Sequence, residues 1–270
     1  MRGTSAASLE AARERIEPML AGTAGKEMGS AMFTVVDTLD SSASLSRALT
    51  DPARDEDGKA DLVIALFGGK VDERVVDFVA GMARSRWSDD ADLADALEEI
   101  AIDAMLAYAQ EAGELEQVED DVFRLDRLLV GQRELRNALV DPKRSAADRS
   151  KLATELLGGR MSPAGLELVL RVATAPRGRR FGDSLSLIGR RAAARRNRIL
   201  ARVTAAVPLT RAQQDRLAGI LERAYGRPVS LNIGVDPAVM GGVRVAIGSD
   251  VIDGTVQARV AEVQRRIAAD

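Results

Sequence analysis

Apolar side chains recur at three- and four-residue spacing through most of the first 198 residues. This period places them on one face of an α-helix, and it predicts amphipathic helices that pack on a core. Segments 30–40 and 119–129 show it clearly, with apolar faces formed by Met32, Phe33, Val36 and Leu39 and by Val122, Leu125, Leu128 and Leu129. We therefore expect a mainly α-helical bundle in this part of the chain.

One stretch of this helical part occurs twice. Residues 45–70, LSRALTDPARDEDGKADLVIALFGGK, align without a gap with residues 135–160, LRNALVDPKRSAADRSKLATELLGGR. In both stretches a short helix ending in Ala-Leu meets an Asp-Pro step, which disfavours continuing the helix through the aspartate. A longer helix then runs to Gly-Gly, where glycine can take the left-handed conformation of a helix end. The pattern predicts a tandem duplication of one helical unit.

After residue 198 the pattern changes to alternation. Segments 199–209, 229–235 and 243–247 alternate between apolar side chains and small or polar ones, which is typical of half-buried strands. Between the first two we expect a helix capped by Thr210. The chain ends in a helical apolar stripe of Val256, Val260, Val263 and Ile267. The order β-α-β-β-α predicts a small α/β domain, so we expect an α+β fold for the whole chain.

These patterns place domain boundaries near residues 91 and 198. Residues 1–91 are expected to form an extra N-terminal helical copy, 92–198 a complete helical domain and 199–270 the small α/β domain. The helix expected at 92–113 stands where the first copy needs its closing helix and the second its opening one. We therefore expect both copies to share it, with Leu93, Leu97, Ile100 and Met105 on one side and Ala96, Ala104 and Tyr108 on the other. The alternative is that the first copy is a flexible, independent appendage.

The amino-acid composition excludes most classes of catalytic site. The 270 residues include no cysteine and no histidine, which excludes thiolate nucleophiles, histidine-based triads and the usual zinc sites. Acidic segments 51–61 and 88–99 lack the spacing of a calcium loop, and carboxylates near helix N-termini explain them better. We expect no catalytic residue, no metal and no cofactor.

The glycine-rich segment 239–256 invites comparison with a phosphate-binding loop. Such loops lead from a strand into a helix N-terminus, usually with a lysine reaching forward. Here the glycines flank a predicted strand and the segment has no lysine. We therefore interpret Gly241, Gly242 and Gly248 as turn residues.

Charge divides the chain into two halves. Residues 1–120 have a net charge of -15 and residues 121–270 one of +12. This polarity indicates that the halves face different partners or face each other; the alternative is a drift in surface composition without function. Segment 171–202 contains ten arginines but only one aromatic residue, Phe181. Nucleic-acid binding through phosphate contacts is one interpretation of this segment. The missing stacking aromatics favour the other, a solvated or protein-facing surface.

No apolar run approaches the ~18 residues that a membrane span needs, and the N-terminus lacks the apolar stretch of a signal peptide. We therefore expect a cytosolic protein.

The C-terminal segment VDPAVMGGVRVAIGSDVIDGTVQARV at 235–260 resembles the signature of the delta subunit of bacterial F-type ATP synthases. The mitochondrial counterpart in that family is the oligomycin-sensitivity-conferring protein. The resemblance covers about residues 100–270 and rests on the signature residues Asp236, Pro237, Gly241, Gly242, Gly248, Asp253 and Gly254. The chain departs from the family pattern at Ala246, at Ser249 and in its extra N-terminal copy.

The resemblance implies a protein without catalytic activity. It implies a peripheral-stalk adaptor whose helical domain grips alpha subunits of the catalytic head and whose C-terminal domain holds the membrane-anchored b subunit. Val256, Val260, Val263 and Ile267 are candidate contacts for the b subunit; alternatively, this stripe packs on the small sheet. It further implies a place on the cytoplasmic face of the cell membrane, with membrane contact only through partners and no role for nucleic acid.

Overall fold

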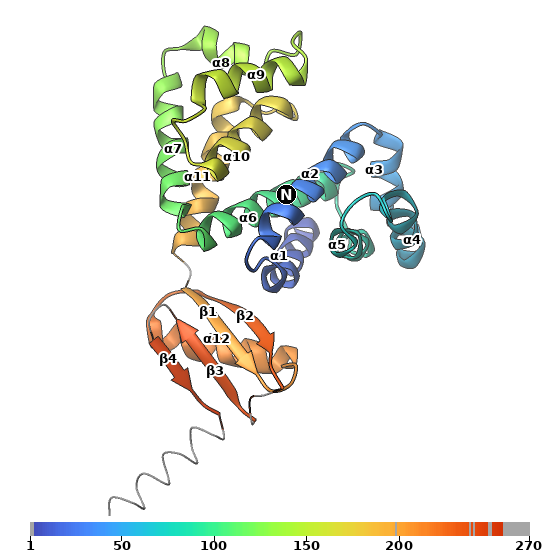
Figure 1. The fold of residues 1–270 in the computed structure, drawn as a ribbon. Coiled ribbons are helices and arrows are strands. Elements are labelled where there is room, and N and C mark those ends of the chain that lie inside the picture. Colours follow the sequence, from blue (N-terminus) through green and yellow to red (C-terminus); the bar gives the residue numbers. More distant parts are fainter. Residues whose placement is uncertain (1–2, 198, 238, 240, 248–249, 256–270) are drawn as a thin grey trace, which may run out of the picture. The chain divides into compact units, whose positions relative to one another are not determined.

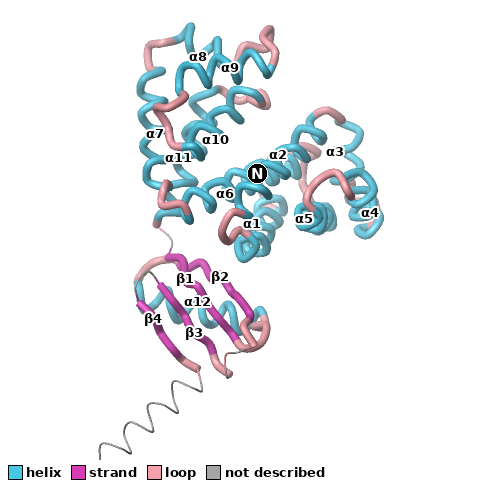
Figure 2. The backbone as a smooth tube through the Cα atoms, in the orientation of Figure 1, coloured by secondary structure: helices cyan, strands magenta, loops and turns pink. Residues whose placement is uncertain are grey.

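The computed structural model describes residues 3–197, 199–237, 239, 241–247 and 250–255. It divides into two compact units, Met1–Arg196 and Asn197–Asp270. Figures 1 and 2 show helices throughout the first unit and the strands in the second. This composition confirms the predicted α+β fold. The division at residues 91 and 198 into domains stays a prediction.

The first copy of the helical unit comprises α1 to α5 with a short 3-10 helix η1. Their bounds are α1 Thr4–Ile16, η1 Glu17–Met19, α2 Ala24–Asp40, α3 Ala43–Thr50, α4 Glu56–Phe67 and α5 Glu73–Arg84. Side chains at the start of α3, α4 and α5 cap them: Ser42, Asp55 and Asp72 each accept a hydrogen bond from a backbone N–H of the first turn. Such caps satisfy donors that have no partner inside the helix.

The long helix α6 precedes α7 to α11, which form the second copy. Their bounds are α6 Asp92–Glu111, α7 Leu115–Leu129, α8 Arg133–Leu139, α9 Ala146–Leu157, α10 Pro163–Thr174 and α11 Phe181–Arg196. The local structure repeats at a spacing of 90 residues. Asp51 and Asp141 each accept the N–H two residues on at 2.9 Å, and Gly69 and Gly159 have φ values of 69° and 72°. The predicted Asp-Pro breaks and glycine ends are thus present in both copies.

Helix α6 contributes to two apolar clusters. Leu93, Leu97 and Ile100 lie in a cluster with α1 to α5, whereas Leu106 and Ala109 lie in a cluster with α7 to α11. The rotation that we expected for this helix was partly wrong. Met105 belongs to the second cluster, and Ala96 and Ala104 belong to the first.

The second unit is a four-stranded sheet with one described helix. Its elements are β1 Ile199–Ala205, α12 Arg211–Tyr225, β2 Val229–Val235, β3 Val243–Ile247 and β4 Asp250–Asp253, and the strand order is β2-β1-β3-β4. β1 is parallel to β2 and antiparallel to β3, and β4 is antiparallel to β3. The alternation expected for β1 is present, since Ala201, Val203 and Ala205 are buried.

In this unit one detail of the sequence prediction is confirmed and two differ. Thr210 caps α12 as expected, in a reciprocal pair of hydrogen bonds with Gln213. The first strand ends at Ala205 rather than continuing to Val207, whose side chain is exposed. The edge strand β4 was not expected, because its side chains are exposed and carry no alternation between buried and exposed positions.

Candidate interaction surfaces

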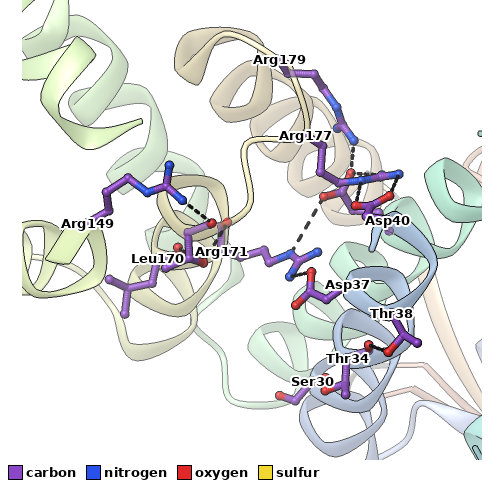
Figure 3. Close-up of polar contacts among 12 residues, drawn as sticks. Ser30, Thr34, Asp37, Thr38, Asp40, Arg149, Leu170, Arg171, Arg177 and Arg179 are labelled. Atoms are coloured by element: carbon purple, nitrogen blue, oxygen red, sulfur yellow. Dashed lines mark hydrogen bonds and ion pairs between the residues drawn. The ribbon is translucent and has the colours of Figure 1, made fainter. Parts of the chain in front are cut away.

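A line of ion pairs joins the two copies within the helical unit, and we call it the seam. It joins Asp37 and Asp40 of α2 and Glu98 of α6 to Arg171 of α10 and to Arg177 and Arg179 of the loop that follows (Figure 3).

Arg177 makes the most contacts in the seam. Its Nε and Nη2 donate to the two carboxylate oxygens of Asp40 at 2.6 and 3.0 Å, and its Nη1 donates to Glu98 Oε2 at 2.9 Å. Arg179 also donates to Glu98, whose side chain is only 6% exposed. A buried carboxylate needs partners of this kind, because an unpaired charge is costly away from water.

A second group of ion pairs lies along α1, α6 and α11. Asp103 accepts hydrogen bonds from Arg191 at 2.7 Å and from Arg13 at 3.3 Å. Arg195 donates to Glu17 at 2.6 Å and to Gln110 at 2.8 Å. Acidic side chains before residue 120 therefore pair with arginines of the predicted basic segment.

These pairs favour one of the two interpretations of that basic segment, a protein-facing surface. Arg171, Arg177, Arg179, Arg191, Arg195 and Arg196 all contact carboxylates of the first 120 residues. Much of the segment is thus a protein-facing surface within one unit. Sequence reasoning did not identify the pairs, and its one signal was the opposite charge of the two halves.

Two further side-chain contacts connect α10 with α2. Lys26 donates to Glu167 at 2.5 Å, and this hydrogen bond raises the pKa of the Lys26 ammonium. The Arg171 guanidinium lies 4.6 Å from the centroid of the Phe33 ring, a distance typical of a cation–π contact. Phe33 is partly buried and packs against both apolar clusters.

An open apolar surface lies on α7, which Figure 1 shows at an edge of the helical unit. Phe123, Leu128 and Val130 are 60%, 70% and 73% exposed. Beside Phe123, α7 and α11 enclose a hollow of about 510 Å³, lined by Glu119, Asp120, Val122, Phe123, Asp126, Leu185, Ser186, Gly189 and Arg190. Exposed apolar side chains beside a hollow mark candidate protein-binding sites.

The glycine-rich signature forms turns around β3. Gly241 and Gly242 have φ values of 72° and 82°. A Cβ on Gly242 would lie 2.5 Å from the carbonyl oxygen of Gly254, so the backbone passes too closely for a side chain. Gly254 N–H donates to the Val243 carbonyl at 3.0 Å. Gly242 and Gly254 therefore lie against each other at the end of the β3–β4 pair.

Asp253 and Asp236 also have defined positions. Asp253 accepts hydrogen bonds from Thr255 N–H at 3.0 Å and from the Arg244 guanidinium at 3.1 Å, and the bonds from Thr255 are the main reason that its pKa is lowered. The Asp236 N–H donates to the Ala205 carbonyl at 2.9 Å, and Pro237 follows it at the exposed end of β2. Gly248, Val256, Val260, Val263 and Ile267 lie outside the described residues.

Two features are absent from the described residues. None of the helices among them is long and apolar enough to cross a membrane. Within the same ranges, acidic side chains form no group of three or more that could hold a metal ion.

Comparisons with known proteins place the chain in a family. A family model described as "ATP synthase delta (OSCP) subunit" matches residues 102–267, which is more than half of the chain. An ATP synthase subunit delta from Beutenbergia cavernae is 53% identical over 99% of this chain and 100% of its own length. Proteins of the same name from Streptomyces griseus and Streptomyces coelicolor are 41% and 42% identical over 99% and 100% of this chain and 100% and 99% of their own lengths.

The full-length relatives also match the N-terminal copy, which lies outside the family model. Among solved structures, a chain of the Toxoplasma gondii mitochondrial ATP synthase hexamer aligns at 18% identity with a TM-score of 0.28. It covers 63% of this chain and 96% of that chain, and so low a score carries no argument about the fold. The family model and the full-length relatives agree with the residues of the signature, and the chain belongs to the ATP synthase delta (OSCP) subunit family.

Proposed function

We propose that this chain is the stator adaptor of a rotary F-type ATP synthase. Its helical unit binds alpha subunits of the catalytic head, and its C-terminal unit binds the b subunit of the peripheral stalk. The observation that carries the proposal is the match, over 99% of the chain, to relatives named ATP synthase subunit delta.

The architecture supports an adaptor. Two compact units with separate apolar clusters can each present one binding surface. Joining two binding surfaces in one chain raises the total affinity through effective concentration, which a stator that must not slip requires. The chain itself is expected to have no catalytic role, and its membrane contact, at the cytoplasmic face, would run through its partners.

Removal of the C-terminal unit tests the assignment of one partner to each unit. A chain ending at Asn197 keeps both apolar clusters of the helical unit, so it should fold. We expect it to bind the catalytic head and to lose b-subunit binding by more than 100-fold in calorimetry. Undiminished b binding by this truncated chain would show that the assignment is wrong.

The contact with the b subunit is proposed on the stripe of Val256, Val260, Val263 and Ile267. Val260→Asp in the full chain should weaken b binding about tenfold or more, because an apolar interface core does not tolerate a charge. Arg223→Asp, an exposed change on α12 of the same unit, is the matched control. If Val260→Asp instead unfolds the C-terminal unit, the stripe packs on the sheet and the proposed contact fails.

A further inference from the structure

A small cavity lies inside the helical unit, between α6, α10 and α11. Its volume is about 10 Å³, and among its apolar lining stand four polar side chains, those of Glu98, Arg171, Arg179 and Ser184. One water molecule needs roughly 10 to 15 Å³ of such space and two to four polar partners. The cavity therefore has the size for one water molecule and for nothing larger.

Arg171 brings hydrogen-bond donors without acceptors to this cavity. Its Nη1 donates to Asp37 at 2.7 Å (Figure 3). Its Nε and Nη2 are buried and have no hydrogen-bond partner among the described residues. The side chain is only 10% exposed, so bulk solvent does not supply the acceptors. A buried guanidinium N–H without an acceptor is costly, and Arg171 therefore requires an acceptor inside the cavity.

Glu98 provides the opposite group, an acceptor without a donor. Its Oε2 accepts from Arg177 and Arg179. Its Oε1 lies 4.0 Å from Arg171 Nε, which is too far for a hydrogen bond. Two atoms at this separation can both lie about 2.9 Å from one water oxygen, so a single water molecule bridges them.

Ser184 of α11 adds a hydroxyl to the cavity. It is 7% exposed, and its side chain has no hydrogen-bond partner in the described part of the chain. At the 90-residue spacing of the repeat, Ala94 of α6 stands at the equivalent position and is buried, and Gly81 stands where α10 has Arg171. Alanine thus satisfies the packing at this position in the first copy, so packing alone does not account for the hydroxyl of Ser184.

We propose that this cavity is the binding site of one buried water molecule. The water accepts a hydrogen bond from Arg171 Nε and donates to Glu98 Oε1 and to Ser184 Oγ, which gives it the three partners typical of buried water. It connects α10, α6 and α11 at the seam. A halide ion does not suit the site, because the buried carboxylate of Glu98 repels an anion. The site is independent of the partners proposed above.

A crystal structure of the full chain at about 1.5 Å resolution tests the site. We expect a single peak of water density within about 3.2 Å of Arg171 Nε, Glu98 Oε1 and Ser184 Oγ. A direct hydrogen bond between Arg171 Nε and Glu98 that closes the cavity would overturn the proposal. In crystals grown with bromide, an anomalous peak at this position would show a halide instead of water and would also overturn it.

Oxygen-17 magnetic relaxation dispersion detects long-lived buried water in solution. Ser184→Val fills the cavity with methyl groups and should lower the dispersion amplitude by the contribution of one water molecule. Ser186→Val is the matched control, since it makes the same change at an exposed position of α11; it should leave the amplitude unchanged. An unchanged amplitude in folded Ser184→Val would contradict the site. The crystal structure of the unaltered chain decides if that variant does not fold.

Discussion

Single residues hold the helical unit together at the seam, and Arg177 is the clearest case. It is the one described residue other than glycine with a positive φ, at 49°. That conformation costs roughly 1 kcal/mol for an L-residue. The guanidinium compensates by binding Asp40, Asp95 and Glu98 at 2.6 to 2.9 Å. The loop between α10 and α11 is therefore held by side-chain contacts rather than by its own backbone preference.

Arg177→Ala should lower the free energy of unfolding by about 2 kcal/mol, because the poorly solvated Glu98 loses one of its hydrogen-bonded guanidinium partners and keeps Arg179 and, at 4.0 Å, Arg171. Alanine retains the unfavourable φ, so the change isolates the guanidinium. Urea denaturation followed by circular dichroism measures it. Arg84→Ala breaks an exposed pair with Asp57 and should change stability by less than about 0.5 kcal/mol. Equal effects of the two variants would contradict the role of the seam.

Asp72 gives a prediction about acid stability. Its side chain accepts hydrogen bonds from Arg74, and mainly for that reason its pKa is lowered. A carboxylate with a lowered folded-state pKa stabilises the fold above its unfolded pKa of about 3.9 and loses that contribution as pH falls through the folded value. Asp72→Asn keeps the cap but has no titrating group. Its stability should therefore fall less steeply than that of the unaltered chain between pH 4 and pH 2.

Urea midpoints at pH 7, 4, 3 and 2 measure the effect. At pH 7 the two chains should be within about 1 kcal/mol, because the Arg74 pair is exposed. Parallel pH profiles would show that Asp72 does not contribute to acid unfolding.

Local rules predicted the features that depend on neighbouring residues. The glycine turns, the Asp-Pro breaks and the Thr210 cap each involve groups within a few positions of one another. The partners of the arginines were not predictable in this way. Arg177 and Asp40 are 137 residues apart in the chain, and only the helix arrangement brings them together.

At the scale of elements, α6 shows where pattern reasoning fails. This helix is buried on nearly all sides, and its narrow polar stripe of Asp92, Asp95, Glu99 and Asp103 does not say which apolar residue meets which neighbour. Its existence was therefore predictable, whereas the side on which Met105, Ala96 and Ala104 pack was not. The strands of the second unit show the same limit, since exposed β4 had no alternation to reveal it.

A destabilising substitution in the second copy should also lower the stability of the first copy, because α6 belongs to both clusters. Leu185→Ala removes a fully buried side chain of α11 and should cost about 3 kcal/mol. The only tryptophan, Trp87, lies in the first cluster. We expect its fluorescence to report a lower urea midpoint in this variant.

The control for this experiment lies in the second unit. Leu221→Ala removes a buried side chain of the sheet cluster and should leave the Trp87 midpoint unchanged. If Leu185→Ala also leaves it unchanged, the first copy unfolds independently. The alternative of a separate appendage would then hold.

At the scale of the whole molecule, acidic side chains of residues 1–120 form ion pairs with arginines of residues 121–270 within the helical unit. Six of the ten arginines of segment 171–202 are consequently held in ion pairs with carboxylates of the same unit, which leaves them less available to phosphates. We expect no binding to duplex or single-stranded DNA tighter than about 10 µM at 150 mM salt, measured by fluorescence anisotropy, and only weak binding at 50 mM salt. Micromolar or tighter binding that survives 150 mM salt would restore the nucleic-acid interpretation.

The shared helix also fixes the angular phase between the two copies. One residue inserted after Ala101 would turn the rest of α6 by about 100° and move it by about 1.5 Å. Ile102, Leu106 and Ala109 would then face away from the second cluster. Seven inserted residues would nearly restore the direction, but they would separate the copies by about 10 Å and pull the seam apart. Insertions and deletions should therefore be tolerated in the loops around α6 but not within it. A change in the length of α6 would alter the orientation of one copy relative to the other.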